Sequence, residues 1–163
     1  MKALLLILIL LAAPFTAKSG QRPENALPKH LAGALESATE VTLFSLDPKG
    51  DSAEANDSHP RLVHWRILGK TNIVDVQQRR AAVTSLMDAI LNFNGLIAKC
   101  FNPRHALRVK TSTRTYDFII CFECNSAAVW EGKKRLTSVG ITGTQKPLDD
   151  IFTAANVPLP KSP

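Results

Sequence analysis

Residues 100–124 read CFNPRHALRVKTSTRTYDFIICFEC and hold all three cysteines of the chain. The run Phe118–Phe122 is apolar, β-branched and aromatic, which favours a central strand buried on both faces. Before it, Leu107–Thr111 alternates apolar and polar residues, as a strand with one solvated face does. Ser112 and Thr113 lie between the two runs and can turn the chain. The stretch therefore predicts a β-hairpin.

The length of the hairpin turn decides which cysteines meet. A two-residue turn places Cys124 opposite Phe101, and a three-residue turn places it opposite Cys100. Opposite residues of an antiparallel pair lie about 4.5–5.5 Å apart at Cα, which is within disulfide range. Pro103 cannot donate to a strand ladder, so a bulge near it would shift the register. We predict a disulfide between Cys100 and Cys124, with Cys121 left as a free thiol.

The segments CFNPRH and CFEC together resemble a pair of motifs in a family of small secreted bacterial proteins of unknown function. The similarity extends from about Thr42 to about Pro158 and includes Leu68-Gly69-Lys70. The resemblance implies that the cysteine-rich patch matters to these proteins, but it implies no activity.

Residues 1–19 have the pattern of a cleavable signal peptide. Lys2 precedes an apolar run over residues 3–13, which has the length of a signal-peptide core and is shorter than the roughly 20 residues that span a bilayer. Small residues precede two cleavage points, so we expect the mature chain to begin at Gly20 or, as the alternative, at Lys18. The expected location is secreted or periplasmic, with no transmembrane segment after cleavage.

Length and charge limit the number of domains and the kinds of partner that the chain can have. The 163 residues, 45% of them hydrophobic, suffice for one domain with a core. We expect a flexible arm over residues 20–28, a single domain over 29–158 and a proline-rich tail over 159–163. Without residues 1–19 the chain loses Lys2 and Lys18, leaving 18 basic and 14 acidic residues and a formal charge of +4. This charge is too small to demand a nucleic-acid partner.

The rest of the chain supplies further strands and helices. Helical periodicity predicts helices over 30–38 and 76–94 and a third beginning at Pro147. Strands are predicted over 40–46, 62–68, 127–131 and 135–141, beside the hairpin. Because consecutive strands are joined by short turns, the sheet should be mostly antiparallel. We expect an α+β fold with about five to six strands and two to three helices packed on one face.

The cysteines allow three interpretations. Cys100, His105, Cys121 and Cys124 make a Cys3His set of the kind that binds zinc. Against zinc, residues three apart on a strand point to opposite faces, and CxxC redox pairs lie at helix N-termini, where the thiolate is stabilised. The preferred interpretation is a structural disulfide in an oxidising compartment. No metal or cofactor is expected.

The candidate functional patch consists of Arg104, His105, Cys121 and Glu123. Arg104 and His105 could bind an anion or act as an acid–base pair, and Glu123 could lie near Arg104. A lone histidine of this kind is more often a hydrogen-bonded structural residue. The sequence contains no HExxH motif, nucleophile elbow or glycine-rich phosphate loop, so no catalytic residue is assigned.

Basic residues are frequent on the predicted strands and their turns: Lys99, Arg104, Arg108, Lys110, Arg114 and residues 133–135. They indicate either an anionic ligand or surface, or charged strands that resist aggregation. We expect a non-enzymatic structural or ligand-binding domain. The alternative is a metal-binding or enzymatic site built on the candidate patch.

Overall fold

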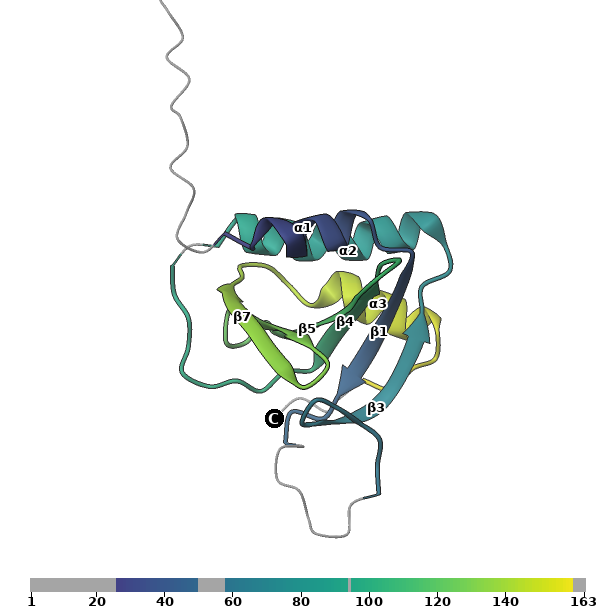
Figure 1. Ribbon diagram of the computed structural model, residues 1–163. Helices are drawn as coiled ribbons and strands as arrows, with labels where there is room; N and C mark the ends of the chain where they lie inside the picture. Colours follow the sequence, from purple (N-terminus) through teal and green to yellow (C-terminus); the bar gives the residue numbers. More distant parts are fainter. Residues whose placement is uncertain (1–25, 50–57, 94, 160–163) are drawn as a thin grey trace, which may run out of the picture.

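The computed structural model describes residues 26–49, 58–93 and 95–159. The predicted signal peptide, most of the predicted arm and residues 160–163 lie outside this range. Among the described residues, none of the helices combines the length and the apolar character needed to cross a membrane. The elements are α1 (Lys29–Glu36), β1 (Glu40–Leu46), β2 (Arg61–Leu62), β3 (Trp65–Asn72), α2 (Val76–Leu91), β4 (His105–Lys110), β5 (Thr115–Cys121), β6 (Ser126–Glu131), β7 (Lys134–Gly140) and α3 (Lys146–Ala154) (Figure 1).

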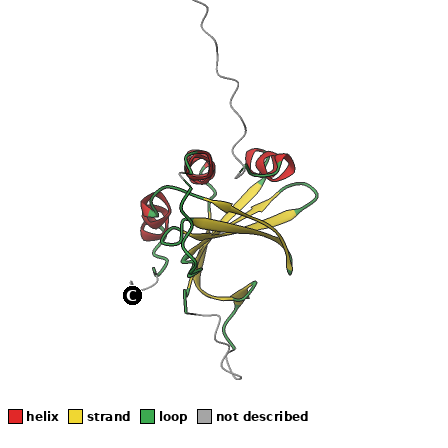
Figure 2. Cartoon of the chain, turned by 90° about the vertical axis from the view of Figure 1, so that its left-hand side faces the viewer, coloured by secondary structure: helices red, strands yellow, loops and turns green. Residues whose placement is uncertain are grey.

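The strands form one antiparallel sheet in the order β2-β3-β1-β4-β5-β6-β7, and Figure 2 shows that the sheet is curled. The α+β prediction is confirmed, but seven strands exceed the expected five to six. The difference lies in residues 62–68, where a hairpin replaces the single predicted strand. β2 and β3 pair across Val63 and His64, with Leu62 opposite Trp65. Val63 has a φ of 57°, which is rare for a β-branched residue, so no residue at this turn signals it.

The central hairpin has the register of a two-residue turn. Lys110 of β4 lies opposite Thr115 of β5, which leaves Ser112 and Thr113 between the residues that close the turn. The hydroxyl of Thr111 accepts hydrogen bonds from the backbone N–H groups of Thr113 and Arg114, at 3.3 and 3.0 Å. A threonine side chain therefore stabilises this turn, which has no glycine.

Alternation along the strands separates two apolar clusters, because successive strand residues point to opposite faces. One cluster joins buried residues of all three helices to the strands: Leu31, Leu35, Leu86, Ile90, Leu148 and Phe152 with Leu43, Leu107, Phe118 and Val129, among others. The second contains the intervening strand residues Phe44, Leu46, Ala106 and Ile119, together with Leu62 and Trp65. Each large side chain that is fully buried contributes about 1.5–3 kcal/mol before ordering costs.

Helix α2 begins where the sequence predicts. The carboxylate of Asp75 accepts a hydrogen bond from the backbone N–H of Gln78 at 2.7 Å, which satisfies one of the free donors at the helix start. The helix ends at Leu91, before the predicted end at Asn94. The segment from Gly95 to Arg104 then crosses to β4, and it supplies one wall of the candidate site.

Candidate functional site

The CFEC motif is a turn between β5 and β6. Cys121 pairs with Ser126, so Phe122, Glu123, Cys124 and Asn125 form the connection. Asn125 has a φ of 51°, a left-handed conformation that asparagine tolerates better than most residues. The expectation that the strand continues through Phe122 is therefore wrong. Asparagine, in place of glycine, lets the chain reverse.

The disulfide lies within this turn. Cys121 is bonded to Cys124, and Cys100 is a free, exposed cysteine. The predicted pairing of Cys100 with Cys124 is thus wrong, because the turn folds Cys124 back onto Cys121. The predicted proximity holds nevertheless, since the Sγ atoms of Cys100 and Cys124 are 3.2 Å apart.

The four residues of the alternative zinc set do not converge. His105 lies opposite Ile120 of β5. Its side chain therefore points into the first apolar cluster, the one that contains the buried helix residues and is called the helix cluster below. Cys121 follows Ile120 and therefore points to the other face. In addition, the Cys121–Cys124 bond occupies two of the sulfurs that would have to bind the metal as thiolates. Within the described residues, no three His, Cys, Asp or Glu side chains are arranged to hold a metal ion.

His105 anchors α3 to the sheet. Its Nε2 atom lies 2.7 Å from a carboxylate oxygen of Asp149, and its ring stacks on Phe152 with 5.6 Å between centroids. The residue is 1% exposed. Burial lowers the pKa of His105, and this effect outweighs the opposing hydrogen bond and charge of Asp149. His105 is therefore a buried structural histidine.

We expect His105 to make the protein less stable as the pH falls. The unfolded chain takes up a proton on this histidine near pH 6.5, whereas the folded protein does so only at lower pH because the folded pKa is lowered. The free energy of unfolding should therefore decrease from pH 6.5 down to the folded pKa and level off below it. The difference in free energy of unfolding between wild type and His105→Gln, measured by urea denaturation, should become smaller as the pH falls through this window. An unchanged difference between pH 8 and pH 5 would contradict the assignment.

The candidate patch is divided into three separate pairs. Arg104 forms an ion pair with Glu123, as the sequence analysis suggested, while His105 bonds to Asp149 and Cys121 to Cys124. The side chain of Arg104 is 8% exposed. The first pair joins the residue before β4 to the β5–β6 turn, the second joins β4 to α3, and the third closes the β5–β6 turn. The structure does not combine the four residues into one reactive centre.

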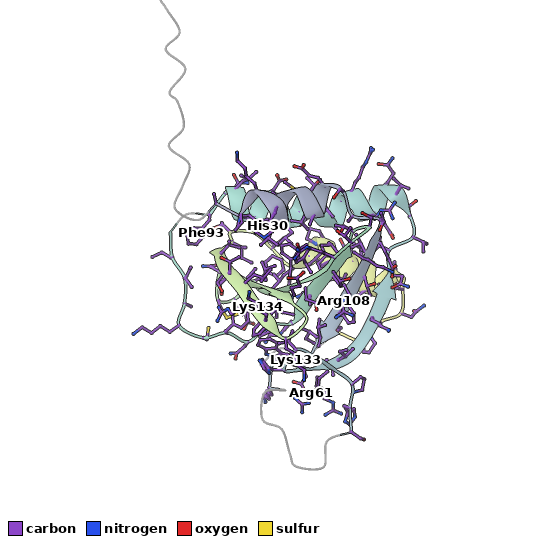
Figure 3. The ribbon with its side chains drawn as sticks, viewed as in Figure 1. His30, Arg61, Phe93, Arg108, Lys133 and Lys134 are labelled. Atoms are coloured by element: carbon purple, nitrogen blue, oxygen red, sulfur yellow. A yellow bond between two sulfur atoms is a disulfide. The ribbon has the colours of Figure 1, made fainter. Side chains whose placement is uncertain are left out.

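Most of the basic strand residues are also paired. Cross-strand ion pairs join Arg104 to Glu123, Arg108 to Asp117, Lys110 to Glu40 and Arg114 to Glu131. Because these basic side chains are paired with acidic ones, they do not form a continuous basic surface. The pairing favours the interpretation that they are charged strand residues that resist aggregation. Figure 3 labels Arg108 on the sheet and Lys133 and Lys134 at the β6–β7 turn. Lys99 and Arg135 instead border a cavity.

This cavity, of about 270 Å³, lies against the face of β6 and β7 that points away from the helix cluster. The segment from Gly95 to Arg104, called the crossing segment below, forms one wall of the cavity. Two hydrogen bonds hold it there: the Ala98 N–H donates to the Cys124 carbonyl at 3.0 Å, and the Asn125 side chain donates to the Leu96 carbonyl. Its lining is Trp65, Ile97, Ala98, Lys99, Cys100, Phe101, Ser126, Ala128, Trp130, Arg135 and Ser138.

Three aromatic residues define the cavity wall. The rings of Trp65 and Phe101 meet edge to face with centroids 5.6 Å apart, and Trp130 lies on β6. The indole nitrogen of Trp130 is buried and has no hydrogen-bond partner among the described residues. Sequence analysis missed this set because its members are far apart in the chain. One signal was available: the chain contains two tryptophans, and both line the cavity.

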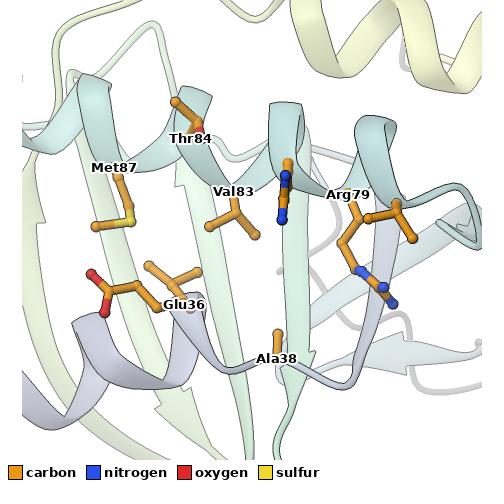
Figure 4. Close-up of a pocket in the computed structure, with 9 residues that line it drawn as sticks. Glu36, Ala38, Arg79, Val83, Thr84 and Met87 are labelled. Atoms are coloured by element: carbon orange, nitrogen blue, oxygen red, sulfur yellow. The ribbon is translucent and has the colours of Figure 1, made fainter.

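A second, larger groove of about 450 Å³ runs between α1 and α2. Figure 4 shows Val83 and Met87 of α2 facing Glu36 of α1 across it. Arg79, at one end, already donates a hydrogen bond to the carbonyl of Thr39 at 3.2 Å. The lining contains no aromatic ring. Because aromatic walls and unpaired polar groups mark ligand pockets, the cavity beside β6 is the better candidate.

A comparison of the chain with protein-family models, curated proteins and solved structures finds no match. Function is therefore inferred from the residues and their geometry.

Proposed function

We propose that the protein binds a small, mainly apolar organic anion in the cavity beside β6 and β7. In this proposal the three helices pack on one face of the sheet and supply stability, while ligand binding belongs to the opposite face. The protein acts as a binding domain without a catalytic step, in a secreted or periplasmic location. The Cys121–Cys124 disulfide is consistent with that location, since disulfides persist mainly in oxidising compartments.

The apolar part of the ligand follows from the cavity wall. Trp65, Phe101 and Trp130 present aromatic rings, and Ile97, Ala98 and Ala128 add aliphatic surface. Ligand pockets usually measure roughly 300–1,000 Å³ and are lined mainly by such side chains. A cavity of about 270 Å³ is slightly smaller than this range, so it suits a ligand of one or two fused rings.

The charge of the ligand follows from the polar groups. Lys99 and Arg135 border the cavity, and they provide cations but no acid. The single observation that carries the proposal is the indole N–H of Trp130, which is buried without a partner among the described residues. A buried donor left unpaired costs about 1–3 kcal/mol, and a ligand oxygen that displaces the atoms covering the indole N–H and accepts its hydrogen bond would recover this cost. A carboxylate supplies such an oxygen and also complements the two cations.

We expect wild-type protein to bind 2-naphthoate about tenfold more tightly than 2-naphthalenemethanol in titration calorimetry, because a hydrogen bond to a charged group contributes about 1.5–3 kcal/mol. Trp130→Phe keeps an aromatic ring but removes the indole donor, so it should weaken 2-naphthoate binding by a similar factor. Arg135→Gln should weaken binding of the anion and leave binding of the neutral alcohol unchanged.

Arg80→Gln is the matched control, because Arg80 borders the groove between α1 and α2 and not the cavity. This variant should bind 2-naphthoate as the wild type does. Equal affinities of wild type, Trp130→Phe and Arg135→Gln for 2-naphthoate would refute the proposed site. A loss of affinity confined to Arg80→Gln would place the ligand between the helices instead.

A further inference from the structure

The three cysteines lie together with unequal access to solvent. Cys121 and Cys124 are 1% and 0% exposed, so the sulfurs of their disulfide are shielded from external reagents. Cys100 is exposed, and its Sγ atom lies 3.2 Å from that of Cys124. The only free thiol among the described residues is therefore in contact with one sulfur of a buried disulfide.

This contact has the elements of a thiol–disulfide exchange reaction. Exchange requires a thiolate that can reach one sulfur of a disulfide and displace the other. The backbone N–H of Asn102 lies 3.4 Å from the Sγ atom of Cys124, where it can stabilise negative charge on that sulfur. Cys100 also lines the cavity, so a molecule in the cavity can contact this residue.

We propose that Cys100, Cys124 and Cys121 form a thiol–disulfide exchange site through which small dithiols reduce the buried disulfide. The Cys100 thiol loses its proton to solvent, and its thiolate attacks the Sγ atom of Cys124. A Cys100–Cys124 bond forms, the Cys121–Cys124 bond breaks, and Cys121 leaves with the electron pair and takes up a proton. This step is an isomerisation and needs no oxidant or reductant.

The Cys100–Cys124 disulfide formed in this step has one accessible sulfur, because Cys100 is exposed. A substrate thiolate attacks Cys100, forming a mixed disulfide and releasing Cys124 as a thiolate beside the Asn102 N–H. The second thiol of a dithiol substrate then attacks the substrate sulfur and frees Cys100. Two electrons pass from the dithiol, which becomes a disulfide, to the protein, which ends with three thiols. The inference rests on the sulfur geometry and is independent of the proposed ligand.

The test is the rate at which dithiothreitol reduces the folded protein, followed by acid quenching, alkylation and mass spectrometry. Without Cys100 the reductant must reach a sulfur that is shielded, so Cys100→Ser should react at least about tenfold more slowly than wild type. Ser138→Ala is the matched control, because it changes the same cavity and leaves the sulfurs in place. It should react at the wild-type rate, and in denaturant all three proteins should react equally.

Equal rates for folded wild type and Cys100→Ser would overturn the proposal. A second variant tests the exchange step without kinetics. Cys121→Ser leaves Cys100 and Cys124 as the only cysteines, and oxidised glutathione should convert them to a Cys100–Cys124 disulfide in a non-reducing peptide map. If glutathione remains attached to Cys100 and Cys124 stays a thiol, the two sulfurs do not exchange and the proposal fails.

Discussion

Phe152→Ala is expected to lower the free energy of unfolding by about 3–5 kcal/mol, the usual cost of deleting a buried phenylalanine. Phe152 is 0% exposed and belongs to the cluster that joins the helices to the sheet. Its ring also stacks on His105, so the substitution leaves a cavity beside the hydrogen bond that holds α3 to β4. Urea denaturation at neutral pH measures the loss.

Phe101→Ala removes the same atoms from a partly buried ring in the second cluster, and it should destabilise the protein clearly less. Because Phe152 belongs to the first cluster and does not line the cavity, folded Phe152→Ala should still bind 2-naphthoate with wild-type affinity. A cost below that of Phe101→Ala would show that α3 does not contribute to the core as the structure indicates.

Arg108→Met is expected to lower the free energy of unfolding by about 2 kcal/mol, because it leaves the buried carboxylate of Asp117 without its charged partner while solvent screens the half-buried Arg108 side. Arg108 Nε and a carboxylate oxygen of Asp117 are 2.6 Å apart, and the side chains of Arg108 and Asp117 are 39% and 5% exposed. This bond raises the pKa of Arg108. The guanidinium also lies 5.3 Å from the ring centre of Phe44, which adds a cation–π contribution.

Lys110→Met provides the comparison on the same strand and face. Lys110 pairs with Glu40 at 3.5 Å, and both side chains are more than half exposed, so its loss should change stability by less than about 1 kcal/mol. Replacing both members of the buried pair, by Arg108→Met with Asp117→Leu, should restore much of the stability because no unpaired charge remains. Chemical denaturation of wild type, the two single variants and the double variant measures these free energies of unfolding. Equal losses of stability for Arg108→Met and Lys110→Met would show that the Arg108–Asp117 pair contributes no more than an exposed one.

Local chemistry determined a large part of the fold. β1 occupies the predicted residues Glu40–Leu46, α2 begins after its Asp75 cap, and the central hairpin has one of the two registers derived from its turn. These features depend on alternation, capping and turn length, which act between residues close in the chain. The α+β class follows from them, because short connections make consecutive strands antiparallel.

Two turns in which a residue other than glycine adopts a positive φ could not be predicted in this way. Val63 and Asn125 adopt positive φ values. Val63 reverses the chain inside the single strand predicted over 62–68, and Asn125 closes a turn that begins one residue before the predicted end of its strand at Phe122. The cost of such a conformation must be offset by packing of the flanking strands. The turn at Asn125 then decided the disulfide, because it brings Cys124 to Cys121 instead of extending it toward Cys100.

The candidate sites depended on contacts between distant segments. Residue patterns were enough to place Arg104 and His105 beside the start of a strand and all three cysteines on one hairpin. The hydrogen bond from His105 to Asp149 of α3 depends on tertiary packing. So does the cavity that Trp65, Phe101 and Trp130 line together. The curl of the sheet and the path of the crossing segment create these contacts, and both result from the packing of the whole chain. Periodicity and spacing predict which face of an element a residue occupies. They do not predict which residue of a distant segment packs against it.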